Sequence, residues 1–402
     1  MLTNLKDCQN NMNYKLMWKI DAVCGVVICY LITVFDNLLY LFRKKQVKTD
    51  KIKRIIVMKF WGMGSIIMAS PALKALKENY KDSHITFLTL SRNKEICEHL
   101  KLIDEVVTVR LDNGIVLFLK DLLFTVIALR KKRFDLLLDF EFFTRFSAIL
   151  TYLIGAKISV GFNTWEVWRG NFHTVKVPFN RYWHLTDNFI NMVSKVGVKV
   201  SSTGYVYPVI DKKDKDIVKH LLEEKWSSFE NIVAVNVNND PMAYERRWPK
   251  NNFVEIINKL IEKHGSKVVL VGSRAESGYV SEFESEINKK DSILNLAGKT
   301  NLAQLAGLFE LCKFLLTNDS GPMHLAASVK LPTVSLFGPE TPLLCGPYGK
   351  SDVVIFKNID CSPCMNVHSA KRVMCSKQSA ECMDKITVAE VLNKIEERFF
   401  NT

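Results

Sequence analysis

FLLTNDSGPMHLAASV, residues 314–329, is the stretch of sequence that decides both the fold and the expected chemistry. Its apolar first part predicts a buried strand, and Asp319 or Ser320 can then cap a helix. Gly321 lets the backbone come close to a ligand, and His324 lies one turn into the helix. Free N–H groups at a helix start, with the helix dipole behind them, bind phosphate. On these residues alone, an ordinary capped helix with a satisfied histidine remains the alternative.

Alternating strand and helix patterns extend from this stretch in both directions. The first half predicts strands at 52–59, 84–90, 105–109, 135–140 and 158–162, with helices at 66–80, 117–130, 147–154 and 185–196. The second half predicts strands at 232–238, 267–272, 293–296, 314–317 and 333–337, with helices at 251–264, 302–312, 322–329 and 387–399. Such a series indicates an α/β protein with doubly wound parallel sheets.

A polar stretch at 201–215 interrupts the series and predicts a domain boundary. We therefore expect an N-terminal apolar segment (1–50), a first Rossmann-like domain (51–205) and a second one (206–402). Ligands of such sheets bind at the carboxyl ends of the strands, which here would face a cleft between the halves.

Composition and charge narrow the class of partner. The 402 residues are 48% hydrophobic and carry a net charge of +13, which suits an ordinary globular protein with anionic partners. Nucleotide diphosphates and an acidic membrane surface fit this charge. Nucleic acid is not expected as a partner, because no nucleic-acid-binding module is recognisable and the basic residues are dispersed.

The N-terminal segment predicts an association with a membrane. Residues 22–35 carry no charge, the apolar character resumes at 38–42, and Arg43-Lys44-Lys45 follow. We expect an uncleaved anchor, either a poor span or a helix lying in the interface, with the main body on the cytoplasmic face of a bacterial inner membrane. A helix packed on the protein itself is the alternative.

Four stretches resemble glycosyltransferase family 9, the bacterial heptosyltransferases of the lipopolysaccharide inner core. TNDSGPMHLAASVKLPTVSLFGPETPLLCGPYG (317–349) is similar to the family's C-terminal signature, and RRWPKNNFVEIINKL (246–260) to its basic-x-Trp-Pro element. IIVMKFWGMGSIIMASPALKALKENY (55–80) and FDLLLDFEFFTRFSAILTYLIGAKISVGF (134–162) resemble its N-terminal domain. The resemblance implies a GT-B fold, an ADP-heptose donor and inversion at the anomeric carbon.

The resemblance also implies a donor site. Asp319, Ser320, Gly321 and His324 would contact the diphosphate and sugar of the donor. Arg246 would neutralise the leaving nucleotide diphosphate and would count as catalytic, with no metal and no other cofactor required. Arg246 could instead be a surface charge. The expected donor-binding set is completed by Asn238 and Glu276.

The glycine loop after the first strand departs from the family. Gly62 and Gly64 match, but Ser65 stands where the family has an aspartate that is its proposed base. An unperturbed serine cannot serve as a general base. Either Asp139 or Glu141, at the end of the fourth strand, takes this role, or the base comes from elsewhere, or transfer activity has been lost.

The last quarter of the chain contains a group of four cysteines, Cys361, Cys364, Cys375 and Cys382. The leading C-x-x-C has the character of a metal ligand, but the later spacing does not repeat it. A structural zinc ion or an iron–sulfur cluster, disulfides and unligated thiols all remain possible from the sequence.

The sequence as a whole predicts a membrane-associated, metal-independent, inverting glycosyltransferase. It would move a sugar, expected to be heptose, from a nucleotide-diphosphate donor to a lipopolysaccharide or another lipid-linked envelope glycan. Two other functions compete with it: a sugar-nucleotide epimerase, and a catalytically silent nucleotide-sugar-binding protein of an envelope-glycan machine.

Overall fold

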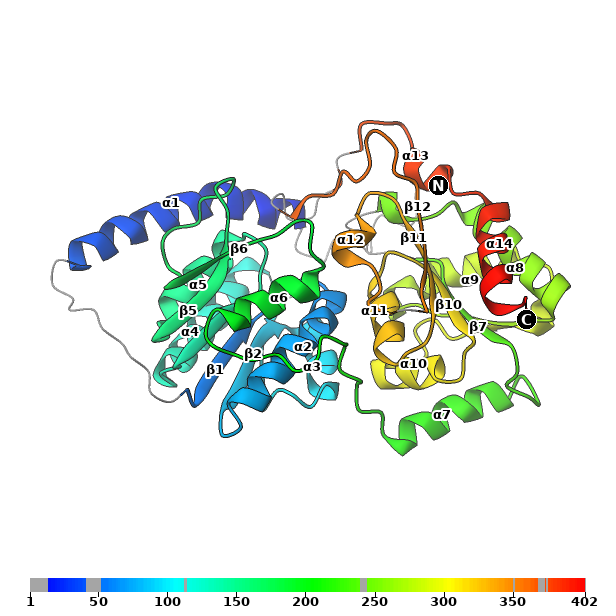
Figure 1. The fold of residues 1–402 in the computed structure, drawn as a ribbon, viewed down its shortest axis with the longest axis horizontal. Helices are drawn as coiled ribbons and strands as arrows, with labels where there is room; N and C mark the ends of the chain where they lie inside the picture. The colour runs from blue at the N-terminus through cyan, green and yellow to red at the C-terminus, as the bar shows by residue number, and fades with distance from the viewer. Residues whose placement is uncertain are drawn as a thin grey trace.

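The computed structural model of this chain describes residues 14–40, 52–111, 114–238, 244–349, 351–367, 373 and 375–401. Figure 1 shows two α/β domains side by side, with a long helix lying along the N-terminal one. The predicted fold class is confirmed, because each domain contains a six-stranded sheet in which every recorded strand pair is parallel.

The N-terminal sheet has the strand order β3-β2-β1-β4-β5-β6. Its strands are β1 Arg54–Met58, β2 His84–Leu90, β3 Glu105–Val109, β4 Leu136–Asp139, β5 Ile158–Asn163 and β6 Val175–Pro178. Its helices are α2 Met63–Asn79, α3 Lys94–His99, α4 Ile115–Lys131, α5 Arg145–Ile154 and α6 Leu185–Ser194. The central strands are apolar on both faces because helices cover both sides of the sheet.

The C-terminal sheet repeats this topology, with the order β12-β11-β10-β7-β8-β9. Its strands are β7 Ile232–Asn236, β8 Lys267–Leu270, β9 Ile293–Asn295, β10 Phe314–Asn318, β11 Thr333–Phe337 and β12 Val353–Phe356. Its helices are α7 Lys212–Glu223, α8 Lys250–His264, α9 Ser277–Ser285, α10 Leu302–Phe309, α11 Gly321–Ser328, α12 Pro342–Cys345, α13 Glu381–Asp384 and α14 Val388–Phe399.

The strand order reverses direction at one point in each sheet. In the N-terminal domain this point lies between β1 and β4, where Val57 pairs with Leu138. In the C-terminal domain it lies between β7 and β10, where Val235 pairs with Leu316. Ligands of open parallel sheets bind outside the carboxyl ends of strands at such points. The fold therefore provides two positions for a binding crevice, one in each domain.

The connection between the last helix of the first sheet and the first helix of the second runs from the end of α6 at Ser194 to the start of α7 at Lys212. The backbone N–H of Val206 donates to the hydroxyl of Ser70 at 2.9 Å, and that of Val209 donates to the carbonyl of His99 at 2.9 Å. The connection is thereby held against the N-terminal domain.

Helix α1, Tyr14–Tyr40, precedes the first sheet. Its segment Lys19–Leu38 is long and apolar enough to cross a membrane, with a mean hydropathy of 1.7. In the structure this helix packs along α5, so the predicted apolar N-terminal helix is present and one side of it contacts the protein. The predicted basic cluster that follows, Arg43-Lys44-Lys45, lies outside the described residues.

Candidate active site

A cleft of about 1380 Å³ lies between the two domains. Residues that follow the ends of β1 and β4 border it on the N-terminal side, and residues that follow β7 and β10 border it on the C-terminal side. The predicted site residues that line it are Gly62, Gly64, Ser65, Glu141, Asn238, Arg246, Glu276, Asp319, Ser320, Gly321 and His324. Of the predicted catalytic, donor-binding and acceptor-side residues, Asp139 alone is not among the described lining residues.

The start of α11 is organised differently from the predicted cap. Ser320 is the N-cap residue, but its side chain makes no capping hydrogen bond. Its hydroxyl instead lies 2.9 Å from the hydroxyl of Thr317 and accepts from the side-chain amide of Asn236 at 3.0 Å. The first N–H groups of α11 are therefore free of a side-chain cap from Ser320, and they stand at the positive end of the helix dipole.

Arg246 lies beside this helix start. It belongs to a short 3-10 turn, Tyr244–Arg246, and its guanidinium forms an ion pair with Asp319 at 3.1 Å. The backbone N–H of the buried Trp248 donates to the side-chain oxygen of Asn318 at 2.9 Å and fixes the arginine loop to the end of β10. The arrangement directs a cation and a helix N-terminus toward one part of the cleft.

Asn238 presents a buried amide to the cleft. The residue is 1% exposed, and neither side-chain polar atom has a hydrogen-bond partner among the described residues. A buried amide without partners costs about 1–3 kcal/mol, so a ligand that satisfies it would bind more favourably. Asn238, which belongs to the donor-binding set expected from the sequence, thus lines the cleft just beyond the end of β7.

Glu276 lies at the rim of the same crevice but is engaged with its own helix turn. Its carboxylate accepts from the backbone N–H of Ser273 at 2.7 Å, and the two residues form a capping box. Nearby, the guanidinium of Arg247 stacks on the rings of Tyr244 and Tyr279, 4.5 and 5.0 Å from their centroids.

The two domains meet through two glycines. A methyl group on Gly64 would lie 2.4 Å from Cδ2 of His324, and one on Gly321 would lie 2.7 Å from Cε of Met63. Each helix start thus supplies a glycine that receives a side chain from the other domain. His324 is buried, and its Nδ1 lies 3.3 Å from the hydroxyl of Tyr205 in the connection.

Gly62 precedes α2 with a φ of +84°, a conformation that favours glycine. It closes the turn that lets the backbone N–H of Ser65 donate to its carbonyl at 3.0 Å. Ser65 is buried at the cleft. The turn at Gly62 therefore brings Ser65 to the cleft.

Glu141 lines the cleft at the switch point of the N-terminal sheet. One carboxylate oxygen accepts hydrogen bonds from Nζ of Lys59 at 3.1 Å, from the backbone N–H of Trp61 at 3.0 Å and from the backbone N–H of Phe60. Lys59 is fully buried and lies 4.3 Å from the ring centroid of Phe142. Sequence reasoning did not select Lys59, although a lysine that ends an apolar strand was a usable signal.

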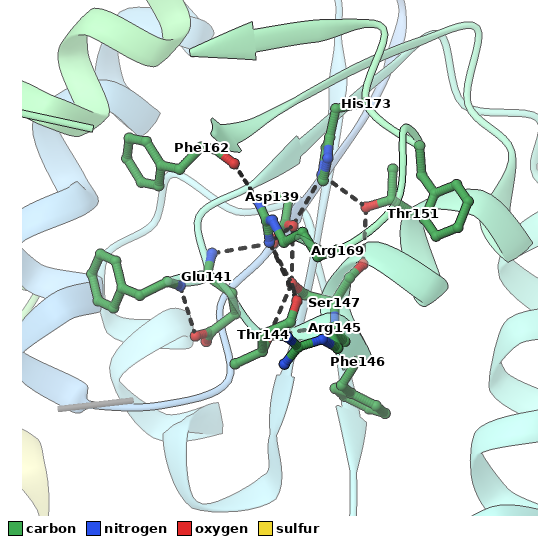
Figure 2. A network of polar contacts seen from close by, with 12 residues as sticks. Asp139, Glu141, Thr144, Arg145, Phe146, Ser147, Thr151, Phe162, Arg169 and His173 are labelled. Carbon is green, nitrogen blue, oxygen red and sulfur yellow. Dashed lines mark hydrogen bonds and ion pairs between the residues drawn. The ribbon is translucent and has the colours of Figure 1, made fainter. Parts of the chain in front are cut away.

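Asp139, at the end of β4, belongs to a buried network of polar side chains (Figure 2). Its carboxylate pairs with the guanidinium of Arg169 at 3.1 Å, lies 3.0 Å from Nε2 of His173 and accepts from the hydroxyl of Ser147 at 2.9 Å. Burial alone would raise its pKa, but Arg169 and the hydrogen bond from His173 hold the pKa of Asp139 below its ordinary value. The backbone N–H of Glu141 also donates to Asp139 at 3.1 Å, so this network supports the loop that carries Glu141.

The four C-terminal cysteines line a second, small cavity of about 250 Å³. All four are free thiols, and burial together with the neighbouring Cys364 raises the pKa of Cys382 to about 11. Among the described residues, no three His, Cys, Asp or Glu side chains are arranged to hold a metal ion. The fold thus brings all four cysteines to one cavity.

Comparisons with known proteins agree with this geometry. The family model for glycosyltransferase family 9 (heptosyltransferase) matches residues 126–374. Lipopolysaccharide heptosyltransferase 2 of Escherichia coli K12 is 25% identical over 327 residues, which are 76% of this chain and 88% of that protein.

Two solved structures share the fold. A family 9 glycosyltransferase from Veillonella parvula superposes with a TM-score of 0.71 at 23% identity, covering 88% of this chain and 98% of that one. The ADP-heptose lipopolysaccharide heptosyltransferase II of Escherichia coli gives a TM-score of 0.68 at 20% identity, covering 87% and 99%. At these identities the likeness supports the two-domain fold.

Proposed function

Because this chain belongs to glycosyltransferase family 9, the heptosyltransferase family, we propose that it transfers heptose from ADP-heptose to a lipopolysaccharide or another lipid-linked envelope glycan. The observation that carries the proposal is the convergence of Arg246 and the start of α11 on the carboxyl end of β10, inside a cleft shared by both domains. Positive charge at this place suits a nucleotide diphosphate.

The donor would lie in the crevice of the C-terminal domain. Its diphosphate would contact the N–H groups of α11 at Gly321 and the guanidinium of Arg246, and the buried amide of Asn238 would gain partners from the sugar or the nucleotide. Asp319 now pairs with Arg246, and we propose that this ion pair holds the guanidinium in position before the donor arrives. Arg246 and the helix start together would stabilise the leaving diphosphate without a metal ion.

The reaction would be a direct displacement with inversion. A hydroxyl oxygen of the acceptor forms a bond to the anomeric carbon, the bond from that carbon to the diphosphate oxygen breaks, and ADP leaves with the electron pair. The proton of the hydroxyl passes to a base. We assign this role to Glu141, because this residue lines the cleft and Lys59, Phe60 and Trp61 all donate to the same one of its two carboxylate oxygens, whereas Asp139 does not line the cleft.

The acceptor would enter from the N-terminal domain. Gly62, Gly64 and Ser65 border that half of the cleft, and the first half of α1 borders it as well. A lipid-linked acceptor would reach this side from the cytoplasmic face of the inner membrane.

Thermal shifts with a panel of nucleotide sugars test the donor. ADP-heptose is expected to raise the melting temperature more than UDP-sugars, and Arg246→Ala is expected to abolish the difference. Stabilisation by UDP-sugars alone would contradict the heptose assignment.

Transfer assays with Glu141→Gln test the base. The variant is expected to retain the ADP-heptose thermal shift and to lose transfer by about 100-fold or more. Because Glu141→Gln also deprives the buried Lys59 of its carboxylate partner, the double variant Lys59→Met/Glu141→Gln controls for stability. Full transfer activity in a folded Glu141 variant would assign the base to another residue.

A further inference from the structure

Helix α1 has its polarity reversed relative to a helix on the surface of a soluble domain. The side that faces the protein is small and polar, with Asp21, Gly25, Cys29, Thr33 and Asp36 in one stripe spaced three or four residues apart. The outward side is large and apolar. Val23, Val27, Leu31, Val34, Phe35 and Leu38 are 42–66% exposed. Large contiguous apolar surfaces of this kind mark contacts with a partner or a membrane.

Specific polar contacts hold the small side of α1 against α5. The carboxylate of Asp21 accepts from the backbone N–H of Phe146 at 2.7 Å and of Arg145 at 3.2 Å, at the start of α5. Asp36 accepts from the hydroxyl of Tyr152 at 3.4 Å. Gly25 admits the side chain of Arg145, because a methyl group there would lie 2.9 Å from Cβ of Arg145. Asp21 and Asp36 lie about 22 Å apart along the helix, so much of its length is fixed to the domain.

Helix α4 carries a second exposed apolar surface. Val116, Leu117, Leu119, Leu123, Phe124 and Ile127 are 42–75% exposed. At about 100° per residue these side chains occupy one side of the helix, and the exposed Lys120 and Lys131 lie within the same arc. Apolar side chains interspersed with lysines match the interface of an anionic bilayer.

We propose that the outward faces of α1 and α4 form one docking surface for an anionic phospholipid bilayer, with α1 lying in the plane of the interface instead of crossing it. A crossing orientation of α1 would draw α5 and the edge of a parallel sheet into the hydrocarbon, where unpaired backbone groups are costly. The basic residues Arg43-Lys44-Lys45, which follow α1 in the sequence, and the net charge of +13 add attraction to acidic headgroups.

The docking surface is continuous with the cleft. Ile28 of α1 and Leu119 of α4 are both exposed, and both border the cleft whose other end contains Arg246 and Asp319. Phe118, Ile149 and Leu153 complete an apolar wall between them. This step rests on the proposed function: the apolar wall binds the acyl or other hydrocarbon part of the acceptor, while the sugar of the acceptor reaches Glu141.

Vesicle flotation of the full chain tests the surface directly. Wild-type protein is expected to float with vesicles of phosphatidylglycerol and phosphatidylethanolamine and to bind phosphatidylcholine vesicles more weakly. Leu123→Glu/Phe124→Glu, on α4, is expected to weaken binding by at least about tenfold, since each residue loses the burial of a large apolar side chain. Ile217→Glu, an exposed apolar position on α7 of the other domain, is the matched control and is expected to bind as wild type.

Three results would overturn the proposal. Wild-type vesicle binding by the α4 double variant would show that α4 is not part of the surface. Resistance of membrane-bound protein to alkaline carbonate extraction would show that α1 crosses the bilayer. A dimer that the α4 variant dissociates, without any vesicle binding, would assign the surface to a second copy of the chain.

A separate assay tests the proposed function, with an acceptor oligosaccharide from which the lipid has been removed. The α4 double variant is expected to glycosylate this soluble acceptor at the wild-type rate but a vesicle-embedded acceptor at least about tenfold more slowly. No transfer to either acceptor by wild-type protein that still floats with vesicles would reject the proposed function and leave the docking surface in place.

Discussion

The imidazole of His324, in the second domain, occupies the space that a side chain at Gly64, in the first domain, would need. A Cβ atom at Gly64 would lie 2.4 Å from Cδ2 of the imidazole. The ring cannot easily withdraw, because His324 is buried and its Nδ1 lies 3.3 Å from the hydroxyl of Tyr205. The separation of the two halves of the site is therefore set by the absence of a methyl group at Gly64.

Gly64→Ala is expected to reduce kcat/KM for transfer by about tenfold to 100-fold, because a displacement of reacting groups by about 1 Å has an effect of this size. Steady-state kinetics with both substrates measure the effect. Gly278→Ala, in α9, is the control, since a methyl group there meets no atom within 4 Å. Equal activity of Gly64→Ala and Gly278→Ala would show that the domains do not need this close approach.

Arg246→Ala is expected to lower kcat by about 100- to 1000-fold, the typical effect of removing a donor that stabilises charge developing in the transition state. Arg246→Lys should recover only part of this, because lysine lacks the planar guanidinium. Lys250→Ala removes a cation from outside the cleft and should leave kcat unchanged. A change confined to KM in Arg246→Ala would indicate a role in donor binding alone.

Asn238→Ala separates stability from ligand binding. The buried amide lacks partners among the described residues, so its removal should leave the melting temperature of the free protein unchanged or higher. The thermal shift produced by ADP-heptose should become smaller. A free protein that is strongly destabilised, with an unaltered shift, would show that Asn238 serves the fold.

Asp139→Asn is expected to destabilise the protein by about 3–5 kcal/mol, because it leaves the buried guanidinium of Arg169 without its counter-charge. Denaturant unfolding measures this. Turnover per folded molecule should remain near that of wild type, since Asp139 is not among the residues that line the cleft. A stable but inactive Asp139→Asn would instead place this carboxylate in the chemistry.

The buried His173 is expected to make the stability of the protein depend on pH. Burial lowers the pKa of His173 below 6.5, although the carboxylate of Asp139 acts to raise it. The unfolded chain therefore binds a proton at a higher pH than the folded one, and the free energy of unfolding falls as the pH drops below 6.5. Unfolding curves measured from neutral pH down to about 4.5, above the range of most carboxylates, should show this slope.

His173→Gln should flatten that slope, since glutamine does not titrate. Gly161 must be kept in this variant. A methyl group at residue 161 would lie 2.3 Å from Nε2 of His173, so only glycine leaves space for the side chain at residue 173. An unchanged slope in His173→Gln would assign the pH dependence to other groups.

The central elements of the fold could be predicted because their buried residues form recognisable apolar runs in the local sequence. The bounds predicted for β2, β3 and β11 agree with the structure, since each is a short run of apolar and β-branched residues between polar ends. The edge strands β6 and β12 were not predicted: β6 contains a lysine and a proline among its four residues, whereas β12 is a continuous apolar run that is too short to stand out next to the loop sequence around it.

Helix α7 was not predicted. The polar stretch expected at 201–215 covers its first four residues, and the amphipathic pattern of the remaining residues, 216–223, was not assigned to a helix.

Sequence motifs indicate which segments carry candidate site residues, but not which of these residues contact one another. In the segment from Asp319 to His324, the residues named from the motif, Asp319, Ser320, Gly321 and His324, all line the cleft. The contact of Lys59 with Glu141 and those of Asp139 with Arg169 and His173 join distant parts of the chain, so nothing local reveals them. The choice between Asp139 and Glu141 depended on these contacts, since the two residues are equivalent in any pattern of apolar and charged positions.

The anchoring of α1 would determine which half of the enzyme moves. Asp21 and Asp36 both tie this helix to α5 of the N-terminal domain, while the proposed nucleotide crevice belongs to the other domain. With α1 docked on a bilayer as proposed, a rotation about the connection between the domains would leave the N-terminal half in place and turn the C-terminal half through water. ADP, the product of the proposed reaction, would then be exchanged for fresh donor while the acceptor keeps its place, so that the membrane would act as the fixed frame of the catalytic cycle.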